Sequence, residues 1–351
     1  MRNRIFILIL LIIILVELSM FFSDDSRIEN KNISNQTQTQ IVPNTLSPQA
    51  IKAERIFWSK TINEIGGEKT YKEFKDKYKN ENFGTQHLMA HVVGTFLYQK
   101  EGIKGQAICD STFSFGCYHS FFSQALADKG PSIINDLDKA CLDKFGTFGS
   151  GCQHGIGHGV MEYYGPKRLI EALISCKSTT ANTPLSGCAS GVFMEYNVPI
   201  IITDVDAVST ARPLDIKNPY MPCTSVPENF KEACYYSLSQ WWNQTSFYMD
   251  KWGAQGLLCK NIPDSLYMDT CYLGIGNVVA PDSMYEPKKA VAMCKEMPDL
   301  QSIIFCQAGA SWSFAANPQY EVLAKDMCEE LDTSSKQECL LRSNLLNPAK
   351  Q

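Results

Sequence analysis

Apolar residues run almost without interruption from Ile5 to Phe22, with Glu17 as the charged exception. Eighteen residues of this kind are just long enough to cross a bilayer as a helix. Arg2 and Arg4 lie before the run, and this positive flank favours a cytoplasmic N-terminus. We therefore expect residues 1–22 to form an uncleaved membrane anchor. A cleaved signal peptide is the alternative, and both interpretations place the rest of the chain outside the cytoplasm.

The next segment, residues 23–50, is polar and rich in Asn, Gln and Thr. Such a composition cannot bury enough apolar surface to fold, so this segment is predicted to be a disordered tether. It carries glycosylation sequons at Asn32 and Asn35, and a third begins at Asn243. Whether the sequons are used depends on the host and compartment.

From residue 84 onward, two kinds of segment with helical periodicity alternate. Segments such as 131–141 and 166–176 begin with Pro, which suits the first turn of a helix, and end with Cys. A loop follows, and a second Cys then opens a more apolar helix, for example the one that starts at Cys152. One or two lead-in helices are expected before this array, within residues 51–83.

The cysteines reveal the period of the array. All fourteen fall into pairs separated by 8 to 12 residues, and the second members lie 33 to 37 residues apart except for one interval of 46. The predicted disulfides join Cys109 with Cys117, Cys141 with Cys152, Cys176 with Cys188, Cys223 with Cys234, Cys259 with Cys271, Cys294 with Cys306, and Cys328 with Cys339. Zinc binding by these cysteines is disfavoured, because the close Cys-x2–4-Cys spacing of zinc sites is absent.

The combined pattern predicts an all-α protein. We expect a right-handed solenoid of disulfide-stapled helix–loop–helix repeats, with a period of about 35, over residues 84–346. A single N-terminal transmembrane helix would precede it. Three residues after six of the second cysteines stands Ser or Gly. Because Gly weakens a helix by about 1 kcal/mol relative to Ala, its recurrence here indicates close approach of a neighbouring helix.

Composition narrows the class of partner and the compartment. The chain has 351 residues and a formal net charge of −5, which argues against nucleic-acid binding. Fourteen cysteines are too many for a typical reduced intracellular protein, so the array belongs on the extracytoplasmic side. The membrane is one predicted partner, and a protein or glycan partner is compatible with a repeat surface.

The chain has only five histidines, and all of them share the register of the repeats. His119 and His154 lie two residues after a second cysteine, and His158 lies six after. One period before Cys117, at the same offsets from Thr85, stand His87 and His91. A degenerate first repeat without a disulfide therefore precedes the other seven.

Histidines four residues apart project from one face of a helix, as in helix-borne metal sites. We expect His87, His91, His119, His154 and His158 to bind one or two transition-metal ions, copper or zinc rather than iron. The alternative is a pH-sensitive polar cluster. Glu162, four residues after His158, is a candidate fifth ligand or base, whereas Glu195 shares no helix with a histidine and is expected to face solvent.

Two functions remain open from the sequence. The first is a membrane-anchored, extracytoplasmic metal-binding protein, with catalysis at an ion that has an open coordination position. The second is a non-catalytic scaffold that binds protein or glycan on its concave face, with the histidines in a structural role. Three converging imidazoles with a free ligand position would favour the first function, and a closed set of four protein ligands would favour the second.

Overall fold

The computed structural model describes residues 47–146, 149–180, 187–199 and 212–345. These residues form helices and turns, with no strand among them, so the prediction of an all-α fold is confirmed. The predicted anchor, residues 1–22, lies outside the described residues. Among the helices that are described, none has the length and apolar character needed to cross a membrane.

Two lead-in helices are present, α2 (Pro48–Ile65) and α3 (Gly67–Tyr78). The first begins slightly before the predicted boundary at 51, because the Ser47 side chain accepts a hydrogen bond from the Ala50 amide and caps the helix. Trp58 and Phe74 are buried between the two helices with their ring centroids 5.6 Å apart. Both helices also pack against α4 (Phe83–Glu101), the helix of the degenerate first repeat.

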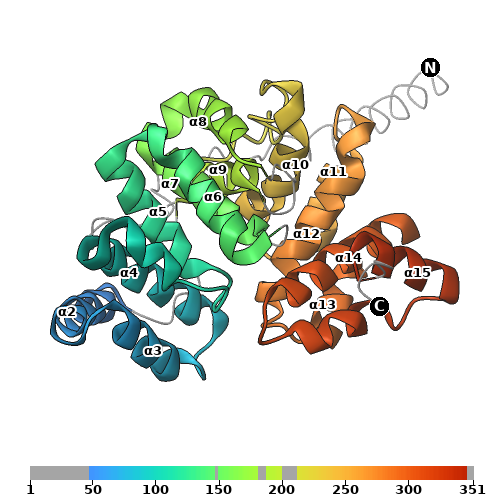
Figure 1. The fold of residues 1–351 in the computed structure, drawn as a ribbon. Helices are drawn as coiled ribbons and strands as arrows, with labels where there is room; N and C mark the ends of the chain where they lie inside the picture. The colour runs from blue at the N-terminus through green and yellow to red at the C-terminus, as the bar shows by residue number, and fades with distance from the viewer. Residues whose placement is uncertain (1–46, 147–148, 181–186, 200–211, 346–351) are drawn as a thin grey trace, which may run out of the picture. The chain divides into compact units, whose positions relative to one another are not determined.

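The more apolar helices follow one another through the structure in chain order, from teal to red in Figure 1. Each packs against the next, beginning with α4. After α4 they are α5 (Gly116–Lys129), α7 (Ser150–Tyr164), α9 (Cys188–Asn197), α10 (Glu228–Trp242), α12 (Met268–Asp282) and α14 (Leu300–Ala316), and the polar helix α15 (Thr333–Arg342), which carries Cys339, follows. Stacked repeats predict this packing of each helix of the set against the next one.

The helical segments that carry a first cysteine are shorter. They are α6 (Ile134–Phe145), α8 (Leu169–Ser175), α11 (Trp252–Lys260), α13 (Pro287–Cys294) and the 3-10 helix η7 (Glu321–Cys328). Cys176 follows the last residue of α8 and begins the short 3-10 helix η5 (Cys176–Ser178). Cys109 and Cys223 lie outside helices, so the predicted alternation of first-cysteine helices with apolar helices holds for the other five pairs.

All seven predicted disulfides are present, and no cysteine is free among the described residues. The bridges join Cys109 to Cys117, Cys141 to Cys152, Cys176 to Cys188, Cys223 to Cys234, Cys259 to Cys271, Cys294 to Cys306, and Cys328 to Cys339. The local pairing scheme is therefore confirmed at every pair. The two cysteines of a bridge are 8 to 12 residues apart, and by loop entropy a closure of this length stabilises the fold by about 3 kcal/mol.

The recurrent glycines lie where neighbouring helices meet. A methyl group on Gly191, Gly274 or Gly309 would lie only 2.0 to 2.1 Å from a backbone carbonyl oxygen of the preceding apolar helix. Only a hydrogen atom fits in that space, so the interpretation of close helix approach is confirmed at these three positions. At Gly155 the nearest atoms are side-chain carbons of α5, at 3.2 Å or more, so the constraint is weaker there.

One contact joins units that are far apart in the sequence. The ring of Phe83, at the start of α4, lies 5.1 Å from the ring of Tyr285, which follows α12. A straight row of repeats would keep these residues apart, so the row must bend enough to bring them together. The right-handed solenoid itself stays a prediction.

The glycine contacts can be tested by their effect on stability. Gly309→Ala should lower the free energy of unfolding by roughly 1–3 kcal/mol, because the new methyl group must push α14 away from the Leu273 carbonyl. Gly253→Ala in α11 is the matched control, since its nearest neighbour is 3.3 Å away and has to move by only a few tenths of an ångström. Denaturant titration without reductant would measure both, and equal effects of the two substitutions would contradict the assignment.

Candidate metal centre

The five histidines come from three consecutive apolar helices, α4, α5 and α7, and their rings gather in one place. His87, His91 and His119 form one triad, and His119, His154 and His158 form a second. Within each triad the three candidate ligand atoms lie within 4.8 Å of one another. The predicted convergence of the histidines therefore occurs, as two triads that share His119.

The first triad is held in a defined orientation. The Nδ1 atom of His87 lies 2.8 Å from the backbone carbonyl oxygen of Phe113, so this nitrogen carries the proton and donates it. In the neutral ring, Nε2 is then left with a lone pair. That atom lies 3.2 Å from Nε2 of His91, which in turn lies 3.0 Å from Nδ1 of His119.

Hydrogen bonds alone satisfy this arrangement poorly. His91 Nε2 has two close nitrogen neighbours, and one of them, His87 Nε2, can only accept. A single proton on His91 would have to be shared between both neighbours, and a lone pair there would face the lone pair of His87. Two imidazole nitrogens that bind one tetrahedral ion at 2.0–2.1 Å are separated by roughly 3.3 Å. The observed contacts are close to that spacing, so a bound cation would resolve the conflict.

The loop that orients His87 has an unusual backbone. Phe113, Ser114 and Phe115 have φ values of 55°, 53° and 60°, in the left-handed region that residues with a side chain rarely adopt. Each such residue costs on the order of 1–3 kcal/mol, so the surrounding structure must hold the loop in place. The disulfide between Cys109 and Cys117 closes this loop.

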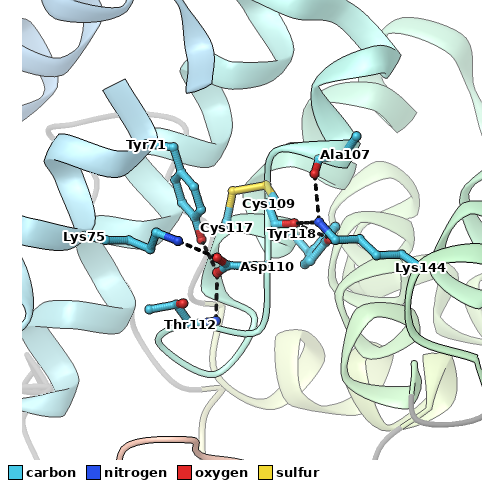
Figure 2. Close-up of polar contacts among 9 residues, drawn as sticks. All are labelled: Tyr71, Lys75, Ala107, Cys109, Asp110, Thr112, Cys117, Tyr118 and Lys144. Atoms are coloured by element: carbon cyan, nitrogen blue, oxygen red, sulfur yellow. Dashed lines mark hydrogen bonds and ion pairs between the residues drawn. A yellow bond between two sulfur atoms is a disulfide. The ribbon is translucent and has the colours of Figure 1, made fainter. Parts of the chain in front are cut away.

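Polar contacts with α3 and within the turn anchor the same loop (Figure 2). Asp110 accepts hydrogen bonds from the Tyr71 hydroxyl at 2.9 Å and from Lys75 at 2.6 Å, both on α3. It also accepts from the Thr112 amide at 2.9 Å, which fixes the turn. Burial by itself would raise the pKa of Asp110, but these hydrogen bonds outweigh it and hold the pKa below its ordinary value. The lead-in helix α3 thus supports the loop that orients His87.

The second triad has its own supporting partner. His158 is fully buried, and its Nδ1 atom lies 2.9 Å from a carboxylate oxygen of Glu195 on α9. Nδ1 therefore donates to the carboxylate, and Nε2 presents its lone pair to His154 Nε2 at 3.0 Å. A carboxylate behind the imidazole is the arrangement that fixes ring orientation and raises basicity in metal sites.

The expectation that Glu195 faces solvent is wrong. Its side chain is only 4 % exposed, because α9 packs directly on α7 and brings the carboxylate behind His158. No histidine lies on α9, so spacing within a single helix carried no signal for it. The available signal was the presence of an acidic residue in an otherwise apolar helix of the adjacent repeat.

The imidazoles are in the form that a metal requires. Burial lowers the pKa of His87, His119, His154 and His158, to about 4 for His154 and well below the ordinary value for His119 and His158. Repulsion among the neighbouring rings adds to this effect for His119, His154 and His158. The four rings are consequently neutral at pH 7, and a neutral imidazole is the ligand form.

Glu162 is not a member of either triad. Burial raises the pKa of its carboxyl to about 7, and its Oε2 atom has no hydrogen-bond partner among the described residues. Its assignment as a ligand or base therefore stays a prediction. The sequon residue Asn243 is 4 % exposed and hydrogen-bonds to Asp282, Asp250 and Gln255, so its amide has a structural role.

Comparison with protein-family models, with curated proteins and with solved structures finds no match to this chain. The case for a function therefore depends on the geometry of the histidines.

The lowered pKa values predict how stability depends on pH in the metal-free chain. An unfolded histidine takes up a proton near pH 6.5, whereas the buried rings resist protonation until lower pH, so the unfolded state binds more protons. The free energy of unfolding should therefore fall as pH decreases from 6.5 to 5, by up to about 1.4 kcal/mol per pH unit for each buried histidine.

Denaturant titration in a chelating buffer would measure this dependence. His154→Gln should reduce the slope of the free energy of unfolding against pH by the contribution of one proton. A free energy of unfolding that stays constant over the interval would contradict the buried, neutral state of the rings.

Proposed function

We propose that this chain is an extracytoplasmic protein that binds transition-metal ions through its histidine triads. The observation that carries the proposal is the first triad, where His91 Nε2 lies within 3.2 Å of two further imidazole nitrogens. Because His87 Nε2 can only accept, His91 Nε2 can donate to His87 or accept from His119 but cannot serve both contacts in full, whereas a bound cation would use the lone pairs of all three nitrogens.

The oxidising compartment is supported by the disulfides. Seven bridges with no free thiol among the described residues are typical of an exported protein and rare in the cytoplasm. Attachment to the membrane through residues 1–22 is part of the proposal, and it depends on the apolar run and its positive flank.

Copper and zinc are the proposed metals. Imidazole suits both ions, and neither requires the reducing conditions that keep iron in the divalent state. Each triad supplies three protein ligands, and among the described residues no fourth His, Cys, Asp or Glu completes either group. One position of a four-coordinate ion would thus be open to water, as in catalytic rather than structural zinc sites. This feature favours a reactive site over a purely structural one.

Metal analysis of the full chain, purified with its disulfides intact, tests the proposal. After equilibration with Zn²⁺ or Cu²⁺ and dialysis, the chain should retain at least one ion. His91→Ala should weaken binding by no less than the roughly 10- to 100-fold that loss of a supporting partner causes. Retention of no metal by the folded wild-type chain would contradict the proposed function.

Gln240→Ala is the matched control for His91→Ala. Gln240 lies on α10, six residues after the second cysteine Cys234. His158 has the same position on α7, six residues after the second cysteine of its own unit. Both substitutions shorten a side chain at the same register of a repeat, but only one removes an imidazole. Equal metal affinity in the two variants would show that His91 is not a ligand.

The carboxylate behind His158 gives a separate prediction. Glu195→Gln keeps the size of the side chain and an oxygen that can accept from His158 Nδ1, but removes the negative charge. The affinity of the second triad for Zn²⁺ should fall by roughly 10- to 100-fold, while the first triad is unaffected. Competition with a chromophoric chelator would measure the loss, and circular dichroism would show that the helices persist.

A further inference from the structure

The two triads share His119. If its two nitrogens bind different ions, the histidines form two linked metal sites, and if only one nitrogen binds, they form a single site. His119 is the only histidine on α5, between two HxxxH pairs on α4 and α7. Its ring centroid lies 5.0 Å from those of His87 and His91, and 5.6 and 4.4 Å from those of His154 and His158. The ring is therefore placed between the two pairs.

One nitrogen of His119 already belongs to the first triad. Its Nδ1 atom lies 3.0 Å from His91 Nε2. Because a nitrogen that binds an ion cannot also carry a proton, binding at Nδ1 leaves Nε2 to carry the remaining proton of the neutral ring.

The other nitrogen has no partner among the described residues. The Nε2 atom of His119 is buried and makes no hydrogen bond to any of them, and the whole side chain is only 3 % exposed. A buried N–H group without an acceptor costs free energy, so a metal ion that replaces the proton on His119 Nε2 would remove that cost. The second triad brings one ligand atom each from His119, His154 and His158 within 4.8 Å of one another, so it holds potential ligands for an ion beside the same ring.

We propose that His119 bridges two metal ions, with Nδ1 bound to the ion of the first triad and Nε2 bound to the ion of the second. This inference rests on the proposed metal-binding function and specifies it as a dinuclear centre. Whichever ion binds later forms a metal–nitrogen bond at the protonated nitrogen of His119 and breaks the N–H bond there, and the proton leaves to the solvent. No atom is oxidised or reduced. With ordinary metal–nitrogen distances on both sides of the ring, the two ions are about 6 Å apart.

The two ions of the proposed centre have the same kinds of protein ligand. Each ion receives one HxxxH pair and one nitrogen of the shared ring, and each pair is oriented by a hydrogen bond from an Nδ1–H group. The acceptor is the Phe113 carbonyl for His87 and the Glu195 carboxylate for His158. The carboxylate makes the second pair the more electron-rich, so Cu²⁺ added in limited amount is expected to occupy that side first.

Copper loading of the full chain, followed by electron paramagnetic resonance, tests the bridge. Two Cu²⁺ ions joined by an imidazolate couple antiferromagnetically, so their low-temperature signal is much weaker than the copper content. We expect two Cu²⁺ per chain, a full signal at the first equivalent, and an integrated signal below half of total copper at the second. Replacing one Cu²⁺ by Zn²⁺ should restore the full signal of the remaining copper.

His154→Ala is the variant for comparison. It leaves His119 in place but weakens the second triad, so it should bind one Cu²⁺ tightly and show the full signal. His119→Ala should lose the coupling at every copper content. The wild-type measurement decides the question even if a variant fails to fold.

Three results separate the modes of failure. One Cu²⁺ per folded chain would overturn the bridge and show that both pairs serve a single ion. Two Cu²⁺ with the full signal of both would overturn it by showing that the ions share no ring. A chain that binds no Cu²⁺ would overturn the bridge as well, and a chain that binds neither Cu²⁺ nor Zn²⁺ would overturn the proposed function itself.

Discussion

The disulfide that joins each apolar helix after α4 to the segment before it is the constraint on which the other features depend. Its two cysteines are 8 to 12 residues apart, and the second lies within the helix, as the first residue of α9 but the seventh of α10 and α14. Because the bridge fixes how the helix is placed against the preceding segment, a given offset from the second cysteine faces the same neighbour in each unit. Gly274 and Gly309 lie three residues after Cys271 and Cys306, and this register brings backbones together there. The histidines use the same register to place imidazoles on one face.

The same register explains why the first repeat needs a different support. Thr85 stands where the other repeats have a second cysteine, and no disulfide holds the start of α4. Here the lead-in helices α2 and α3 pack against α4, and α3 also binds Asp110 in the neighbouring loop. That loop supplies the carbonyl of Phe113 to His87. The orientation of the first triad therefore depends on a chain of contacts that begins outside the repeats.

Burial and metal binding are linked in this centre. Packing the imidazoles together among apolar side chains keeps His87, His119, His154 and His158 neutral, because a charge on any of them would be desolvated. Neutral rings offer lone pairs, but His91 Nε2 is shared by two close nitrogen–nitrogen contacts and can carry only one proton. A cation both uses the lone pairs and removes their mutual repulsion, so a bound ion would stabilise the fold as well as serve the proposed function.

The sequence by itself determined the features that repeat with a fixed spacing. It predicted the helical class, the seven disulfides from Cys109 with Cys117 to Cys328 with Cys339, and the convergence of the histidines, because an offset from a cysteine translates directly into a helix face. Only the tertiary structure decided what each ring meets across a helix interface: Glu195 behind His158, the Phe113 carbonyl at His87, and the contact of Phe83 with Tyr285. These partners come from other helices or from backbone atoms, and their positions depend on how neighbouring helices cross and how the row of units bends, which periodicity within one helix does not encode.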